Sequence, residues 1–160
     1  MAILSVDAGT TGVTVNAVAN GIGNGFNQGG NALTSSSGGV TITANAQAGG
    51  NGYYSTGTIT ATGQAVTIST TTTTGIGIND TGAITAGVVT ITGTQTTATA
   101  TATPVTVTGL ITANSVTITG NGGAATTIVS LGAVTINAGG GNLTVTANNV
   151  AAGGTTGITQ

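Results

Sequence analysis

The chain has 160 residues, contains no Lys, Arg, His or Cys, and has only two acidic side chains, Asp7 and Asp80. Average domains are about a quarter charged, whereas this chain is 1 % charged with a formal net charge of −2. Nucleic-acid binding by counterion release and polybasic membrane anchoring both need Lys or Arg, and disulfides or thiolate metal sites need Cys. The composition excludes all four.

The same composition also disfavours membrane-spanning proteins and enzymes. No apolar run approaches the ~20 residues of a membrane helix, so we expect no membrane insertion. General acid–base catalysis would depend on two isolated carboxylates and two tyrosines. We therefore expect a protein that is not an enzyme and has no catalytic residues, no cofactor and no metal.

An internal repeat runs through the chain. A tetrad of the form apolar-Thr-apolar-Thr, with small variations, begins at positions separated by 27, 26, 23, 27 and 27 residues. A second apolar series precedes it, with separations of 27, 26, 25, 27 and 23. The tetrads occupy residues 13–16, 40–43, 66–69, 89–92, 116–119 and 143–146, and the second series is Val6, Leu33, Ile59, Ile84, Ile111 and Val134. Each copy of about 26 residues therefore contains two short predicted strands.

Other repeated features surround these two strands. Three consecutive copies of the first strand read Gly-x-Ile-Thr-Ala, beginning at Gly57, Gly82 and Gly109. Gly-Gly, Asn-Gly and Gly-Asn pairs separate the strands, and such residues tolerate positive φ at tight corners. A third strand with less regular spacing is indicated by the apolar residues Ile22, Ile76, Ile78, Val105, Val107 and Ile128.

The alternation gives each strand one buried and one exposed face. Strands of four residues are too short to stand alone, but stacking successive copies buries their apolar faces, as in a solenoid. We predict an all-β protein, a parallel β-solenoid of about six coils forming a single domain over residues 1–160. An antiparallel sandwich or meander is the alternative, but it does not explain why the strands recur at a regular interval of about 26 residues. The predicted core ladder is Val13, Val40, Val66, Val89, Val116 and Leu143.

The fold also explains the missing charge. Neighbouring strands lie about 4.8 Å apart, so a charge repeated in every coil would stand directly over its copy, which is destabilising. Thr is neutral, β-branched and suited to strands.

The amino-acid sequences of the repeats resemble those of a known family. Residues 141–149 (Gly-Asn-Leu-Thr-Val-Thr-Ala-Asn-Asn), 132–140 (Gly-Ala-Val-Thr-Ile-Asn-Ala-Gly-Gly) and 157–160 (Gly-Ile-Thr-Gln) are similar to the repeats of filamentous-haemagglutinin-like bacterial surface adhesins. The resemblance implies a right-handed β-helix in a secreted or cell-surface protein of fibrous or adhesive function.

An outward Thr-x-Thr array is the main candidate site. One column is Thr14, Thr41, Thr67, Thr90, Thr117 and Thr144, and the next is Thr43, Ser69, Thr92, Thr119 and Thr146, with Asn16 at its start. Regular Thr columns resemble the ice-facing surfaces of several antifreeze proteins. Thr is also the best uncharged outward residue for a stacked strand, and a further outward array at Thr60, Thr85, Thr112 and Thr135 favours this structural explanation.

Three local features have simpler explanations. Asp7 and Asp80 lack the Gly-Gly-x-Gly-x-Asp repeat of calcium-binding β-rolls and are predicted to bond their own backbone in turns. Phe26, Tyr53 and Tyr54 are predicted in long connections, either as a lateral contact patch or as cover for a loop base. The alternating Thr and Ala of residues 94–108 suit a strand with a narrow apolar face, with Pro104 at a corner or bulge.

The preferred interpretation is a non-enzymatic extracellular structural protein, a filament subunit or a segment of an adhesin stalk, with ice binding as the alternative. Residues 154–159 nearly repeat residues 9–14, and a second copy after Gln160 would place its Val13 30 positions after Leu143. The expected partner is another copy of the chain stacked end to end. Passive adhesion to a surface or glycan is a third possibility, which no residue locates.

Overall fold

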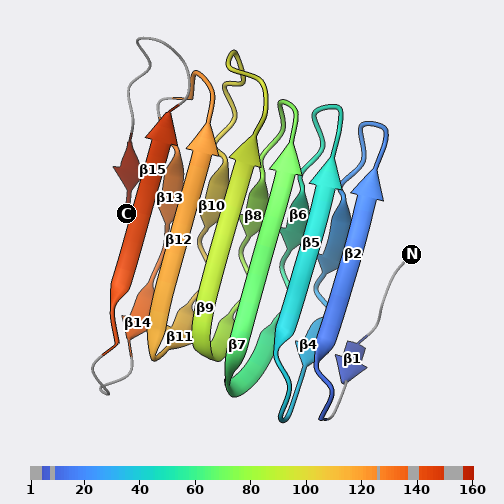
Figure 1. The fold of residues 1–160 in the computed structure, drawn as a ribbon, viewed down its shortest axis with the longest axis vertical. Helices are drawn as coiled ribbons and strands as arrows, with labels where there is room; N and C mark the ends of the chain where they lie inside the picture. The colour runs from blue at the N-terminus through green and yellow to red at the C-terminus, as the bar shows by residue number, and fades with distance from the viewer. Residues whose placement is uncertain (1–4, 8–9, 126, 137–140, 150–156) are drawn as a thin grey trace.

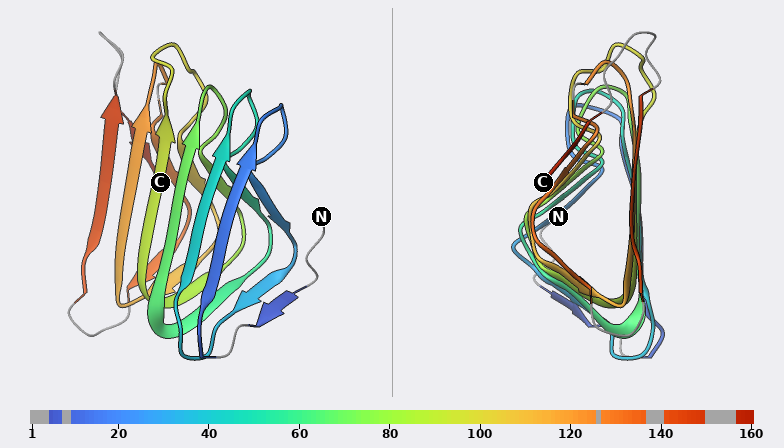
Figure 2. Two further views of the ribbon diagram at one scale, coloured as in Figure 1. Left: turned by 45° about the vertical axis from the view of Figure 1, so that its right-hand side comes forward. Right: turned by 90° about the vertical axis from the view of Figure 1, so that its left-hand side faces the viewer.

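Stacked coils of parallel strands make up the computed structural model, which describes residues 5–7, 10–125, 127–136, 141–149 and 157–160 (Figure 1). All strand pairs of the described residues are parallel, and no helix occurs among them. Viewed along the stack, the coils superpose as a triangle with one long side (Figure 2). The predicted all-β parallel solenoid is confirmed, with six strands on the long side and hence about five turns.

Each side of the triangle is a ladder of strands, one from each coil. The long face consists of β2 (Val13–Ala19), β5 (Val40–Ala46), the second halves of β7 (Ile59–Thr72) and β9 (Ile84–Gln95), β12 (Ser115–Gly122) and β15 (Leu143–Asn149). The first face consists of β1 (Ser5–Asp7), β4 (Ala32–Thr34), the first residues of β7 and β9, β11 (Ile111–Ala113) and β14 (Val134–Ile136). The third face consists of β3 (Phe26–Gly29), β6 (Tyr53–Ser55), β8 (Ile78–Asp80), β10 (Val105–Val107), β13 (Val129–Leu131) and β16 (Ile158–Thr159).

Pairing on the long face follows the sequence repeat residue by residue. Val13, Val40, Val66, Val89, Val116 and Leu143 occupy one register position across the six strands. The short interval of 23 residues between Val66 and Val89 is accommodated before the long face begins, by a register shift between Ala61 and Ala65. Gly63 in this bulge has a φ of 74°, a conformation open mainly to glycine.

The core is a single apolar cluster inside the triangle. Val40, Val66, Val89 and Val116 are completely buried, and Val13 is nearly so. Leu143 is 44 % exposed, because its strand β15 pairs with a neighbour on one side only among the described residues. Apolar side chains stacked between two coils are thus removed from water, and those of an outermost coil are covered on one side.

The third strand is confirmed in part. Ile78, Val105 and Val107 lie on β8 and β10 with their side chains buried. Ile128 is buried directly before β13. Ile22 is instead 87 % exposed, at a bend before β3, because Phe26 takes the inward position of that coil.

The prediction of a strand across residues 94–108 is wrong in its middle. Strand β9 ends at Gln95, residues 96–104 form a loop, and β10 begins at Val105. The buried Gln95 side chain holds this loop: its Nε2 donates to the carbonyls of Gly75 (2.9 Å) and Ala102 (2.7 Å). Pro104 lies at the bend before β10, as predicted.

Glycine is required at the corner between the third and first faces. Gly57, Gly82 and Gly109 stack there, and a Cβ at Gly82 would overlap the carbonyl oxygen of Gly57 in the coil below. The overlapping atoms belong to the backbone, so no side-chain rotation relieves them.

We expect Gly82→Ala to lower the free energy of unfolding by about 3 kcal/mol or more, because backbone overlap forces the coils apart. Gly23→Ala is the matched control, since a Cβ there meets nothing within 4 Å, and it should change stability by less than about 0.5 kcal/mol. Urea denaturation followed by circular dichroism measures both. Equal losses in the two variants would contradict the corner assignment.

Candidate functional site: the long face

The outward side of the long face presents side chains in three columns. In the first column Thr14, Thr41, Thr117 and Thr144 are exposed, and Thr67 and Thr90 are half-buried. In the second, Asn16 and Thr43 are exposed, whereas Ser69, Thr92, Thr119 and Thr146 are half-buried. The third column is Val18, Asn45, Thr71, Thr94, Asn121 and Asn148.

The columns form a two-dimensional lattice. Within a column, equivalent residues follow the strand spacing of about 4.8 Å, and columns are separated by two residues, about 6.7 Å along the strand. All five strand pairs keep one register over these positions, without a bulge. The array is therefore continuous in both directions.

The third column was missed by sequence reasoning, which ended each strand at its tetrad. Polar contacts join several of its members. Asn148 Nδ2 donates to Asn121 Oδ1 (2.8 Å), and Asn121 Nδ2 donates to Thr94 Oγ1 (3.2 Å). The signal was present in the sequence, since Asn45, Asn121 and Asn148 each stand five residues after the first residue of their tetrads.

The other two faces carry no comparable lattice in the described residues. Thr60, Thr85, Thr112 and Thr135 lie on the first face, whose strands supply three residues or fewer before the corner, so they form a single column. Outward Thr is thus general in this chain. A multi-column array is specific to the long face.

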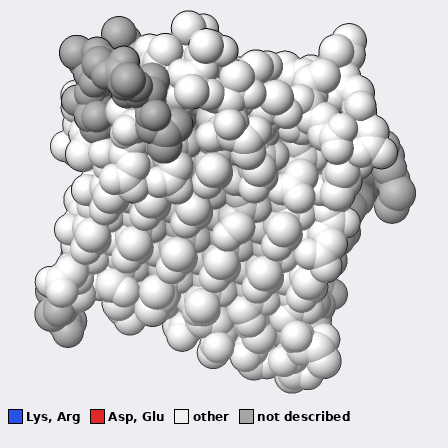
Figure 3. Space-filling view, turned by 45° about the horizontal axis from the view of Figure 1, so that its top comes forward, with Lys and Arg blue, Asp and Glu red and all other residues white. Residues whose placement is uncertain are grey.

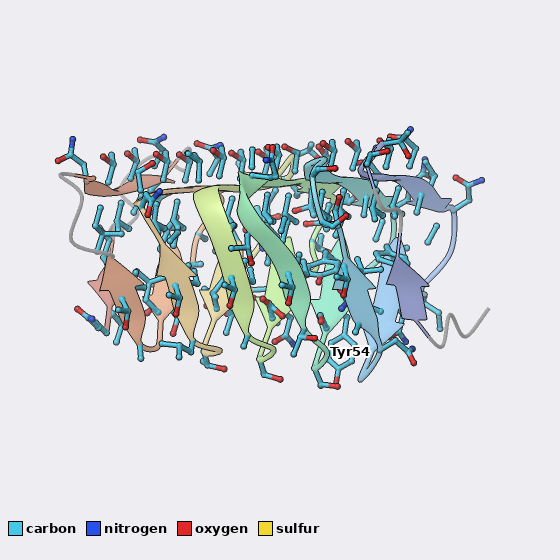
Figure 4. All side chains as sticks on the ribbon, turned by 90° about the horizontal axis from the view of Figure 1, so that it is seen from below. Tyr54 is labelled. Atoms are coloured by element: carbon cyan, nitrogen blue, oxygen red, sulfur yellow. The ribbon has the colours of Figure 1, made fainter. Side chains whose placement is uncertain are left out.

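The aromatic residues lie on the strands β3 and β6 and not in the predicted long connections, and of the two predicted alternatives the lateral patch does not form. Phe26 and Tyr53 lie inside the third face as a stacked pair, with ring centroids 6.0 Å apart and planes at 22°. They occupy the inward register position taken by Ile78 in the next coil. Only Tyr54 points outward, on the side of the molecule away from the long face (Figure 4).

Polar groups accompany this aromatic pair into the core. Gln28 is the extra residue where the β3–β6 register shifts, and its side chain is buried. The Tyr53 hydroxyl donates to Gln28 Oε1 (2.5 Å), while Gln28 Nε2 donates to the carbonyls of Asn31 (2.6 Å) and Thr58 (3.0 Å). The bulged glutamine therefore satisfies both the tyrosine and two corner carbonyls.

Asp80 is a buried carboxyl group at the end of β8, 1 % exposed. Its Oδ1 accepts a hydrogen bond from the backbone N–H of Gly82 (3.1 Å), which confirms the predicted local backbone bond. Its Oδ2 has no hydrogen-bond partner in the described part of the chain. Burial raises the pKa of Asp80 to about 7, with the Gly82 N–H and the Ser55 hydroxyl opposing the rise. Burial and the neighbouring Asp80 carboxylate also raise the pKa of Tyr53.

The surroundings of this carboxyl group can be compared with the ligand sets of metal sites. Among the residues the structure describes, no three His, Cys, Asp or Glu side chains gather around a point where an ion would sit. The same part of the chain contains no helix long and apolar enough to cross a membrane.

Comparison with known proteins adds no relative: no family model, no curated protein and no solved structure matches the chain.

We expect the solenoid to be most stable in acid. The folded-state pKa of Asp80, about 7, exceeds the ordinary value of 3.8, so folding favours the protonated form. The stabilisation is complete below about pH 4 and is lost as the pH rises through 7, a change on the order of 4 kcal/mol. Thermal unfolding from pH 4 to 8 measures it.

Asp80→Asn should flatten this profile, because the amide oxygen still accepts from Gly82 and the side chain no longer titrates. Asp7→Asn removes the other carboxylate and serves as the control, which should keep the wild-type slope. A wild-type stability that rises with pH over this range would contradict the assignment to Asp80.

Proposed function

We propose that the chain is a non-enzymatic, extracellular structural protein whose solenoid serves as a filament subunit or as a segment of an adhesin stalk. One observation carries the proposal: the outermost coils present strand edges that are complementary in pattern to one another. The resemblance to filamentous-haemagglutinin-like repeats supports the cell-surface setting, and it extends the proposal to adhesion on a surface or glycan.

The edges are suited to further stacking. In the described residues, β2 pairs only with β5 and β15 pairs only with β12. Val15 and Val145, which face the core from these outer strands, are partly buried, whereas the equivalent Ile42 is completely buried. Another coil placed on either edge would complete this burial and continue the ladder of backbone hydrogen bonds.

Little opposes such stacking. The edge strands of the long face, β2 and β15, contain no charged residue, and a chain of net charge −2 has weak self-repulsion. The added coil would present Val13, Val15 and Ala17 to Leu143, Val145 and Ala147, which continues the register of the other strand pairs. The contact is therefore head to tail and not two-fold, which generates an open fibre.

We expect the purified chain to form rods that lengthen with protein concentration, seen by negative-stain microscopy and sedimentation velocity. Val145→Lys should prevent growth, because it places a charge at the inward position of the edge. Thr144→Lys carries the same charge on the outward side of the same strand and should still assemble. Circular dichroism establishes that both variants keep their strands.

Monodisperse monomers of the wild-type chain at high concentration would rule out the filament. The stalk is tested separately by joining two copies in one chain and measuring small-angle X-ray scattering. A continuous stalk gives a single rod about twice the length of one copy, whereas two bodies with variable orientation would contradict it.

A further inference from the structure

We propose that the long face is an ice-binding surface, with crystalline water as its ligand. This proposal concerns the side chains of one face, so it goes beyond the structural role and does not depend on it. It rests on the shape, the spacing and the chemistry of the three-column lattice.

The shape of the surface fits a flat crystal and not a small solute. The long-face side chains project from a level sheet to a common height when the face is seen edge-on (Figure 4). The rows are regular across the face, and no charged residue interrupts them (Figure 3). A ligand that uses such a surface fully is itself planar and periodic.

The two spacings of the lattice are similar to repeats of hexagonal ice. The strand separation of about 4.8 Å is slightly longer than the repeat of ice along its a axis, and two residues of strand, about 6.7 Å, are somewhat shorter than its repeat along the c axis. In-register pairing over six strands keeps both spacings uniform from one coil to the next, without a bulge at these positions.

The chemistry suits ordered water. Each Thr offers a hydroxyl group, which donates and accepts hydrogen bonds, and a methyl group, whose removal from liquid water is favourable. Thr67, Thr90 and Thr92, in the middle of the face, are half-buried between neighbouring coils. β-Branched side chains have few rotamers, so their groups are held in place before ice is met and lose little conformational entropy on binding.

Strand β9 supplies a matched pair of variants. Thr90 lies outward in the lattice of the long face, and Thr85 lies outward on the first face. Replacing either by Tyr leaves the net charge unchanged and adds the same bulk to the same strand. Only Thr90→Tyr breaks the flatness of the lattice.

The experiment measures thermal hysteresis and the partition of protein into a slowly grown ice crystal. We expect the wild-type chain and Thr85→Tyr to show both activities, and Thr90→Tyr to lose most of both while keeping its circular dichroism spectrum and melting temperature. Thr92→Tyr, one column away, is expected to give the same loss and guards against misfolding of a single variant.

Two results would overturn the proposal. The first is a folded wild-type chain with neither hysteresis nor enrichment in ice. The second is equal activity in Thr90→Tyr and Thr85→Tyr, which would show that the lattice is not the contact. Ice activity in a chain that never forms rods would reject the filament and leave this proposal standing, and rods without ice activity would do the reverse.

Discussion

Parallel stacking in register is the constraint on which the rest of the structure depends. Each residue lies about 4.8 Å from the equivalent residues of the neighbouring coils, so a side chain must be compatible with copies of itself. Val and Ile satisfy this inside, where they pack as ladders. Thr and Asn satisfy it outside, where Asn148 and Asn121 bond to one another along the column. A repeated Lys or Asp would not, because like charges would face each other in every coil.

The same constraint governs the corners, where backbones and not side chains meet. Gly57, Gly82 and Gly109 lie on top of one another where the third face turns into the first, and the space for a Cβ is filled by the carbonyl below. The third face also departs from the ladder of identical side chains, in addition to the bulge between Ala61 and Ala65. Asp80 is tolerated there because its register neighbours are Ser55 and Val107, so the buried carboxyl group is not repeated.

The sequence predicted those parts of the fold in which apolar and polar residues alternate at the same positions of several successive repeats. The tetrads beginning at Val40 and Val89 alternate apolar and polar residues, and the structure places them on the long face. The second halves of the long-face strands were not predicted, because Ala44 on β5 and the buried Thr70 on β7 take inward positions. Neither residue type is typical of a core. The strands of the third face were harder to predict because they have only two to four residues. They are also joined by connections of unequal length, such as residues 96–104. The aromatic pair was misplaced because nearby Gly and Asn residues suggested a loop. Residues 154–156 of the terminal near-repeat lie outside the described residues.

The two proposed interactions use different groups of the same ladder. End-to-end stacking depends on backbone N–H and C=O groups at the edges of β2 and β15, together with inward residues such as Val145. Binding through the long face depends on outward hydroxyl and methyl groups that never take part in the ladder hydrogen bonds. Because side chains alternate between the two sides of a strand, a change on one side leaves the other nearly intact. End-to-end assembly would then enlarge the array of outward side chains without changing its spacing, since each new coil would extend the same columns. In this proposal a neutral, in-register solenoid would grow along its axis while keeping one flat face unchanged, and both properties would have a common physical origin in the repeat.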